Sequence, residues 1–241
     1  MKKISILFIL LSGINLSFGQ DTLKKHIAKP HMITINCGVS MPLSGFADNA
    51  VLATDGFAKP GLNVDIEAAY FFIKYIGLGV KIGYNTFSID NDRLNASHYE
   101  FNDIGKLNFT FNDGYLCTTV MGGIYSNLLT YKKLTISAKV LAGLLSINKP
   151  KYSVHYDKYN VRTPDASKSV DEDVSANTNF KITGLAGLSL KYQVEPKTSL
   201  NLNVEYTQAS GNFDFTLNDL LRNSQTKIKL INITFGWSFY L

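Results

Sequence analysis

Few side chains in this sequence have types and spacings that could do chemistry. The four histidines, at positions 26, 31, 98 and 155, show no spacing that would bring two of them to one metal ion. His98 follows Ser97, and His155 follows Ser153 by two positions, so each pair offers a nucleophile and a base. No carboxylate is evident to orient either histidine. We therefore expect no catalytic site, no cofactor and no metal site, and we expect that the protein is not an enzyme.

Two acidic clusters offer the oxygen ligands that Ca²⁺ prefers. They are Asp90-Asn91-Asp92 and Asp171-Glu172-Asp173. Neither has the glycine and the distal glutamate of a calcium-binding loop. We therefore interpret both clusters as solvated loop charge.

The elements that must position any such group are strands. From Ile33, apolar residues occupy every second position, which is the period of a β-strand with two unlike faces. The stretch 116–124 has the weakest alternation, because Thr118 and Gly122 interrupt its apolar row. Apolar residues within 107–111 could extend that strand out of phase. The predicted strands cover 33–41, 62–72, 76–84, 116–124, 134–144, 180–192, 200–206 and 231–241.

Connections between these strands alternate in length. The short ones are 73–75, 126–133 and 193–199, and the long ones are 42–61, 87–114, 147–179 and 208–229. Short connections therefore gather at one end of the sheet and long ones at the other. This asymmetry is typical of barrels with short periplasmic turns and longer outside loops. The sequence predicts an all-β fold, an eight-stranded antiparallel up-and-down transmembrane β-barrel with three short periplasmic turns and four long extracellular loops.

The two faces of the predicted strands differ in charge. Alternation alone also fits a soluble barrel with an apolar interior. The interior of an eight-stranded barrel is just wide enough to be filled by side chains, so the many large apolar residues would not fit inside. None of them is charged, as lipid contact requires, because a charge at mid-depth costs about 2 to 4 kcal/mol there. The opposite, lumen-facing side carries glycines and a charge network: Asp65, Glu67, Lys81, Lys139, Lys181, Lys191 and Glu205.

Near balance of acids and bases in this network predicts pairing, which would plug the lumen instead of making a selective pore. A turn centred on Lys74 places Glu67 opposite Lys81 as a cross-strand ion pair. The same strand phases place Cys37 on the lipid face and Cys117 on the lumen face, so we expect no disulfide between them.

Aromatic residues lie near the strand ends and avoid the middles, which predicts two interfacial girdles. At the long-loop ends they are Tyr84, Phe87, Tyr115, Phe180 and Tyr206. At the short-turn ends they are Tyr70, Phe72, Tyr75, Tyr125, Tyr131, Tyr192, Trp237, Phe239 and Tyr240.

The N-terminus has the pattern of a secretory signal. Met1-Lys2-Lys3 is a positive region, Ile4 to Ile14 is apolar, and Ser17-Phe18-Gly19 offers small residues for cleavage. We expect residues 1–19 to be a signal peptide, 20–30 a short periplasmic segment and 31–241 the barrel domain. Hydrophobic residues make up 45% of the chain and charged ones 18%. Removal of Lys2 and Lys3 with the signal lowers the net charge from +5 to +3, which is too mild to indicate nucleic-acid binding.

Several of these segments resemble a known family. They are Gly38-x-Ser40-x-Pro42-Leu43-Ser44-Gly45-Phe46, Gly56-Phe57-Ala58-Lys59-Pro60-Gly61 and the alternating end of the chain. The sequence is similar to the small outer-membrane β-barrel proteins of Bacteroidota, with an OmpA/OmpX-like barrel domain. The resemblance implies an outer-membrane location. It also implies a C-terminal signal for the barrel-insertion machinery, formed by Phe235, Trp237, Phe239 and Leu241, although the last residue is Leu instead of the usual aromatic.

A structural or interaction role through the extracellular loops is the expected function. A small passive channel is the first alternative, and an enzyme that modifies lipid A in the outer membrane is the second. We expect a monomer in contact with lipid and lipopolysaccharide, and Lys227 and Lys229 could meet lipopolysaccharide phosphates. The sequence does not identify a loop ligand.

Overall fold

The computed structural model describes residues 31–47, 57–92, 108–111, 113–148, 152–158, 168–174, 178–217 and 220–241. The predicted signal peptide, the segment 20–30 and the Ser97–His98 pair lie outside the described residues. In the described part of the chain, no helix is long and apolar enough to cross a membrane.

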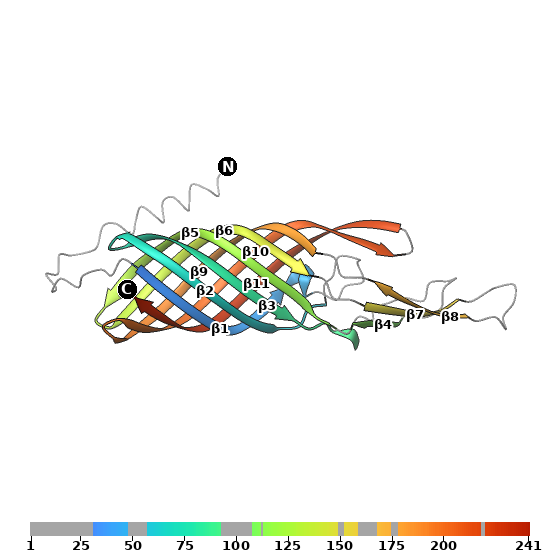
Figure 1. Ribbon diagram of the computed structural model, residues 1–241, viewed down its shortest axis with the longest axis horizontal. Helices are drawn as coiled ribbons and strands as arrows, with labels where there is room; N and C mark the ends of the chain where they lie inside the picture. Colours follow the sequence, from blue (N-terminus) through green and yellow to red (C-terminus); the bar gives the residue numbers. More distant parts are fainter. Residues whose placement is uncertain are drawn as a thin grey trace.

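The long strands close into one antiparallel barrel, in which neighbours in the chain are neighbours in space and the last strand pairs with the first (Figure 1). This confirms the predicted eight-stranded antiparallel up-and-down barrel. Closure leaves no free edge within the barrel wall, so the backbone hydrogen bonds of every strand are made within the sheet. The strands are β1 (His31–Leu43), β2 (Gly61–Ile73), β3 (Ile76–Phe87), β5 (Tyr115–Tyr131), β6 (Leu134–Asn148), β9 (Thr178–Glu195), β10 (Thr198–Leu217) and β11 (Leu220–Tyr240).

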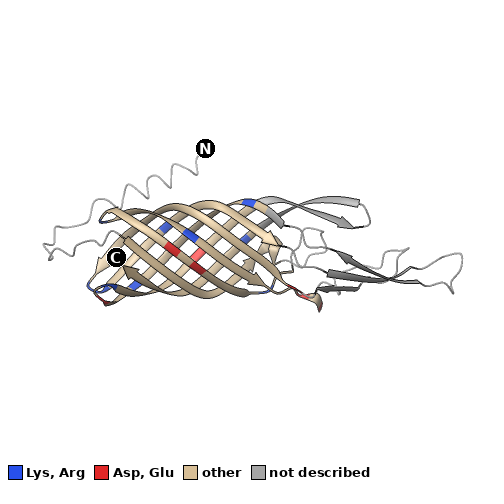
Figure 2. Cartoon of the chain, viewed as in Figure 1, with Lys and Arg blue, Asp and Glu red and all other residues tan. Residues whose placement is uncertain are grey.

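Burial alternates along the strands with the period of two that the sequence shows. Ile66 is 53% exposed and Val140 is 65% exposed, whereas the adjacent Glu67 and Lys139 are each 3% exposed. Apolar side chains thus cover the outside of the barrel, and polar and charged side chains lie in its lumen. In Figure 2, acidic residues in red and basic residues in blue lie together in the middle of the barrel wall. Both cysteines are free, Cys37 outside and Cys117 inside, on the faces that their strand phases predict.

Strand pairing reaches further than the sequence analysis expected. The region 208–229 was predicted as a long loop, but β10 and β11 stay paired as far as Leu217 and Leu220. Phe213, Phe215 and Leu217 alternate with polar residues, although in the phase opposite to that of Leu200–Tyr206. In this hairpin the backbone N–H and C=O groups form hydrogen bonds with each other, whereas in an irregular loop most of them would bond to water.

Two other long connections contain strands of their own. A small sheet has the order β4-β7-β8 and is separate from the barrel sheet. The residues at 108–111 therefore belong to β4 and pair with β7, so they do not extend the strand at 116–124 as the sequence suggested. The strands are β4 (Asn108–Phe111), β7 (Tyr152–Lys158) and β8 (Lys168–Val174).

The predicted aromatic girdles are partly wrong. Tyr70, Phe72, Tyr192, Trp237 and Phe239 are 43 to 53% exposed on the outside of the barrel. Other predicted girdle residues lie equally close to the strand ends, but they occupy positions whose side chains point into the lumen. The prediction used only the distance from the strand ends and did not take this inward phase into account. The aromatic residues that pack inside are Phe87, Tyr115, Tyr125 and Tyr240.

Apolar side chains also fill both ends of the lumen, a feature that the sequence analysis did not anticipate. One group, here called the loop-end cluster, contains Phe46, Ala58, Phe87, Cys117, Leu145, Ile147, Ala209, Ile228 and Leu230. The other, the turn-side cluster, contains Met32, Ala69, Phe71, Met121, Tyr125, Leu141 and Leu185, with Tyr240 packed against it.

The connection after β1 turns back into the barrel mouth. A 3-10 turn, η2 (Ser44–Phe46), places Phe46 in the loop-end cluster, where it is 2% exposed. Its ring meets Phe87 edge-on at 5.3 Å between centroids and lies 5.1 Å from Tyr115. Such aromatic pairs add about 0.5 to 1.5 kcal/mol beyond burial. Phe46 therefore closes the loop end of the lumen with a side chain from a connection.

We predict that Phe46→Ala lowers the free energy of unfolding by about 3 to 5 kcal/mol, because the cavity left behind cannot collapse within a closed wall. Phe46→Leu should cost less, because it keeps most of the apolar volume. Urea unfolding of the barrel in lipid vesicles measures both. Equal, small losses for the two variants would contradict the packing of this ring.

Candidate functional site: the charge network of the lumen

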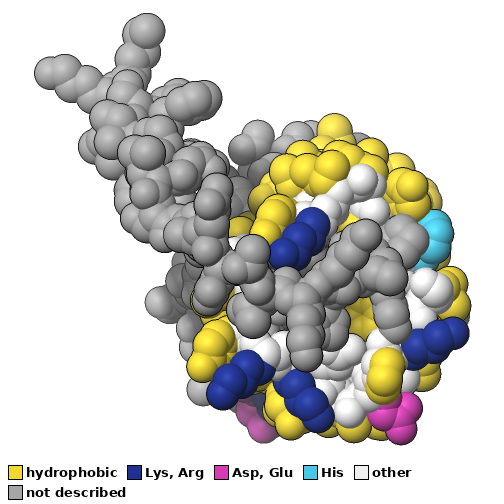
Figure 3. Space-filling view, turned by 90° about the vertical axis from the view of Figure 1, so that its left-hand side faces the viewer, with side chains coloured by type: hydrophobic (Ala, Val, Ile, Leu, Met, Phe, Trp, Pro, Cys, Tyr) yellow, Lys and Arg dark blue, Asp and Glu magenta, His cyan; other side chains and the backbone are white. Residues whose placement is uncertain are grey.

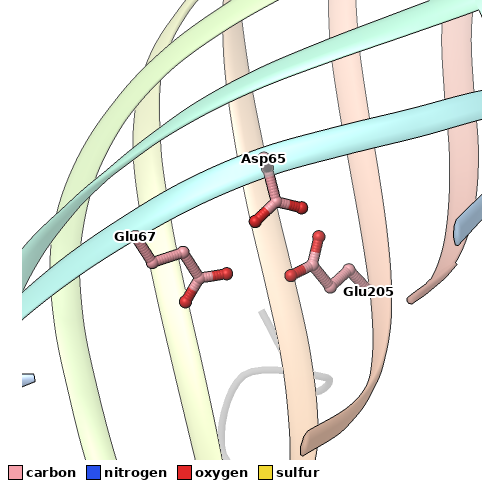
Figure 4. A group of neighbouring side chains, drawn as sticks. All are labelled: Asp65, Glu67 and Glu205. Atoms are coloured by element: carbon pink, nitrogen blue, oxygen red, sulfur yellow. The ribbon is translucent and has the colours of Figure 1, made fainter. Parts of the chain in front are cut away.

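Three carboxylates from two strands converge in the middle of the lumen. Asp65 and Glu67 come from β2 and Glu205 from β10, and one oxygen of each lies within 4.8 Å of the others (Figure 4). Their side chains are 1 to 3% exposed. Anions this close and this buried repel one another strongly unless cations lie between them.

Two lysines supply that positive charge. Lys81 Nζ on β3 lies 2.8 Å from Asp65 Oδ2, 3.2 Å from Glu67 Oε1 and 2.7 Å from Glu205 Oε1. Lys81 thus contacts all three carboxylates from one position. We call these three acids, Lys81 and Lys139 the lumen network.

Lys139 on β6 completes the lumen network. Its Nζ pairs with Glu67 and lies 2.5 Å from Glu205 Oε1. Both lysines are 1 to 3% exposed. Each ammonium therefore bridges carboxylates from β2 and β10, which are not neighbours in the barrel. Taking such charges out of water is costly, and only pairing with further hydrogen bonds compensates for it.

Strand register brings these groups together. Glu67 lies directly opposite Lys81 across the β2–β3 pair, as the turn centred on Lys74 predicts, although the register shifts closer to the turn. Gly187 on β9 lies opposite Glu205 on one side and Lys139 on the other. A Cβ at Gly187 would come within 3.1 Å of both side chains. The glycine thus leaves the space through which Lys139 and Glu205 meet.

Asparagines extend the lumen network around the wall. Asn36 on β1 donates its amide to Asp65 Oδ1 at 2.6 Å and to Glu67 Oε1 at 3.3 Å. Asn203 on β10 donates in turn to Asn36 Oδ1 at 2.9 Å. Neither asparagine is among the site residues predicted from the sequence. Both lie at positions that alternate with the outward apolar row of their strand, and this pattern predicts that they face the lumen.

Two predicted members of the charge network lie apart from its centre. Lys181 is half-buried near the start of β9, toward the loop end. Lys191 is 6% exposed, and within the described residues its Nζ donates to Met32 Sδ at 3.0 Å and has no carboxylate at ion-pair distance. Lys191 lines a small cavity together with Glu67, Lys139 and Tyr125. It thus borders the lumen network without joining it.

Each carboxylate of the lumen network faces at least one lysine ammonium group. The lysine ammonium groups occupy the space between the carboxylates that a metal ion would need. Apolar clusters lie toward both ends of the lumen. The charges are therefore paired with one another instead of lining a water-filled path.

The other candidate residues are distributed as follows. Asp90, from the first acidic cluster, pairs with Lys59 at 3.4 Å near the loop end. Lys229 is half-buried in the outward phase of β11. The side chains of His155, Lys227 and the cluster Asp171-Glu172-Asp173 lie outside the described part of the molecule.

Comparison with known proteins gives weak similarities. No protein-family model matches the sequence, and no curated protein matches it. Among solved structures, Neisserial surface protein A is 9% identical, with 88% of this chain and 97% of that chain covered and a TM-score of 0.47. Ail, the attachment invasion locus protein of Yersinia pestis, is 12% identical, with 88% and 99% covered and a TM-score of 0.40. A major outer membrane protein from Thermus thermophilus is 10% identical, with 87% and 98% covered and a TM-score of 0.38.

We predict strong coupling between Glu67 and Lys81. Lys81→Met should destabilise the barrel by about 3 to 5 kcal/mol, because it leaves buried carboxylates uncompensated, and Glu67→Gln should destabilise it by less. The double variant should recover part of the loss, with a coupling energy of about 0.5 to 3 kcal/mol in a double-mutant cycle of unfolding free energies. The pair Lys59–Asp90, whose side chains are 46% and 15% exposed, is the control, with expected coupling below about 1 kcal/mol. Strictly additive losses at Glu67 and Lys81 would contradict the lumen network.

Two glycines on β9 allow a matched test of lumen crowding. Gly187→Ala should cost about 1 to 3 kcal/mol, because its Cβ presses on Glu205 and Lys139. Gly184→Ala should be neutral or mildly stabilising, because the nearest atom to its Cβ, Leu141 O, is 3.9 Å away. Unfolding in urea reports both. A larger loss at Gly184 than at Gly187 would be inconsistent with the packing around the lumen network.

Proposed function

We propose that the protein is an integral outer-membrane β-barrel with a plugged lumen and a structural or interaction role. One observation carries the proposal: a closed barrel has large apolar side chains outside and charged side chains inside. Ile182 is 78% exposed and Phe235 is 70% exposed, while Asp65 and Glu205 are 1% exposed. This polarity suits lipid around the wall and would be unfavourable in water.

The proposal includes an orientation. The three tight turns face the periplasm, and the longer connections, including the β4-β7-β8 sheet and the paired extension of β10 and β11, face outward. Residues 1–19 act as a cleaved signal peptide that exports the chain. The barrel is a monomer without enzymatic activity, and the outer connections bind a partner or support the envelope. The similarity of its sequence segments to small barrels of Bacteroidota supports this orientation.

The C-terminal signal fits the last strand. Phe235, Trp237 and Phe239 alternate outward on β11, and Leu241 follows at 67% exposure. These residues offer one apolar row to the barrel-insertion machinery. At the opposite end, Lys229 and Tyr206 lie on the outward face, where they could meet lipopolysaccharide.

Fractionation tests the location. The mature protein should separate with the outer membrane and migrate faster on a gel when unboiled, because a closed barrel keeps its backbone bonds in detergent. N-terminal sequencing should begin near residue 20. Recovery of the folded protein from the soluble periplasmic fraction would end the proposal.

The lumen network argues against the passive-channel alternative. We expect poor conductance of the wild-type protein in planar bilayers, because paired charges and two apolar clusters fill the lumen. Glu67→Gln with Lys81→Met should stay poorly conducting, since both replacement side chains still fill space. Stable wild-type conductance at the level of a wide aqueous porin would favour the channel instead.

A further inference from the structure

The turn end of the barrel carries an unbalanced ring of positive charge. Lysines are found in all three turns between barrel strands, and all four are exposed. Among the residues at these three turns, Glu195 is the acidic one. Figure 3 views this end, where blue lysine side chains stand around the rim beside yellow hydrophobic ones. We call the following residues the basic rim: Lys74, Lys132, Lys133 and Lys197.

The opposite end of the barrel is different. Among residues whose side chains are described, its charges balance, and Lys59 there forms an ion pair with Asp90. In the same described part of the chain, none of the basic-rim lysines has a carboxylate at ion-pair distance. The charges that balance at the loop end are Lys59, Lys181 and Lys229 against Asp90, Asp92 and Asp113.

Aromatic side chains hold the basic rim at the border of the apolar surface. Lys74 Nζ lies 5.0 Å from the centroid of the Tyr75 ring, and Lys132 Nζ lies 5.3 Å from that of Tyr131. Both tyrosines are exposed, at 50% and 64%. A lysine ammonium group that lies on an exposed tyrosine ring, at the edge of the apolar outer surface, is at the depth of the lipid phosphates at a membrane interface.

The turns that carry the lysines are tied to neighbouring strands. The carbonyl of Lys133 accepts a hydrogen bond from the Gln193 amide at 2.8 Å, and that of Lys197 accepts one from Tyr240 at 2.8 Å. The carbonyl of Tyr75, next to Lys74, accepts one from Asn127 at 2.9 Å. These bonds tie the three turns to the barrel wall, so a lipid that binds there does not have to order the turns first.

We propose that the basic rim binds the phosphate headgroups of anionic phospholipids in the leaflet that faces the turns. The inference rests on the proposed outer-membrane location and adds a lipid preference to it. Each lysine near an anionic lipid surface strengthens binding by about fivefold. Lysine donates to phosphate as a mobile point charge, which suits headgroups that exchange around the rim.

Spin-label electron paramagnetic resonance tests the preference. The barrel is reconstituted in phosphatidylcholine vesicles that contain trace spin-labelled phosphatidylglycerol or spin-labelled phosphatidylcholine, and the ratio of their association constants is measured. The wild type should prefer phosphatidylglycerol, and added salt should weaken the preference. A variant with all four basic-rim lysines changed to Gln should lose this preference. The ratio of the two association constants should fall by about fivefold for each lysine that contacts a headgroup.

Two control variants separate charge from structure. Changing the four basic-rim lysines to Arg should keep the preference, because the charge remains. The triple change Lys59→Gln, Lys181→Gln and Lys229→Gln at the other end should also keep it. The shift in gel mobility between boiled and unboiled samples checks that every variant is folded.

The outcomes that overturn the inference differ from those that overturn the location. A wild type that inserts into vesicles but does not prefer phosphatidylglycerol overturns the basic-rim inference alone. A variant with the four lysines changed to Gln that keeps the preference for phosphatidylglycerol also overturns it. If that variant keeps the lipid preference but loses binding to isolated peptidoglycan, the basic rim is assigned to the cell wall instead. A wild type that does not insert overturns both proposals.

Discussion

The limited space inside a closed eight-stranded barrel determines how this protein is built. Every second side chain of each strand must enter a lumen that is just wide enough to be filled. Bulky rings enter it beside glycines: a Cβ at Gly77 would come within 3.0 Å of the Phe71 ring, and one at Gly79 within 2.7 Å of the Tyr125 ring. The ionisable groups in the same space have little water to solvate them, so they must neutralise one another. Paired charges at the centre and apolar groups toward both ends are one solution to that constraint.

The period of two along the strands and the positions of the turns were sufficient to predict the strands, their two faces and part of their pairing. Alternation identifies the strands and their faces, because a strand presents successive residues to opposite sides. The tight turn at Lys74 sets the register between β2 and β3, so it places Lys81 directly opposite Glu67 on the adjacent strand. Contacts across the lumen were not predictable in this way. Lys81 and Glu205 come from strands that are not neighbours, and their meeting depends on barrel shape and side-chain conformation.

The errors have equally specific causes. Tyr125 and Tyr240 were assigned to a girdle because of their height, although their strand phase points inward. Phe46 could not be placed, because a connection has no periodic pattern and its path back into the barrel depends on tertiary packing. The region beyond residue 208 is predicted as a loop because the apolar row of Leu200–Tyr206 ends there, and the apolar residues further on occupy the opposite phase.

Pairing of β1 with β11 also determines the order in which the protein can assemble. The first and last strands can meet only after the whole chain is available, and Lys81 and Glu205 are separated by 124 residues. Contacts between residues so distant in the chain form late, because loop closure must precede them. Interactions that form after the folding transition state slow unfolding and have little effect on the folding rate. We therefore expect the lumen network to slow the unfolding of the finished barrel without accelerating its formation.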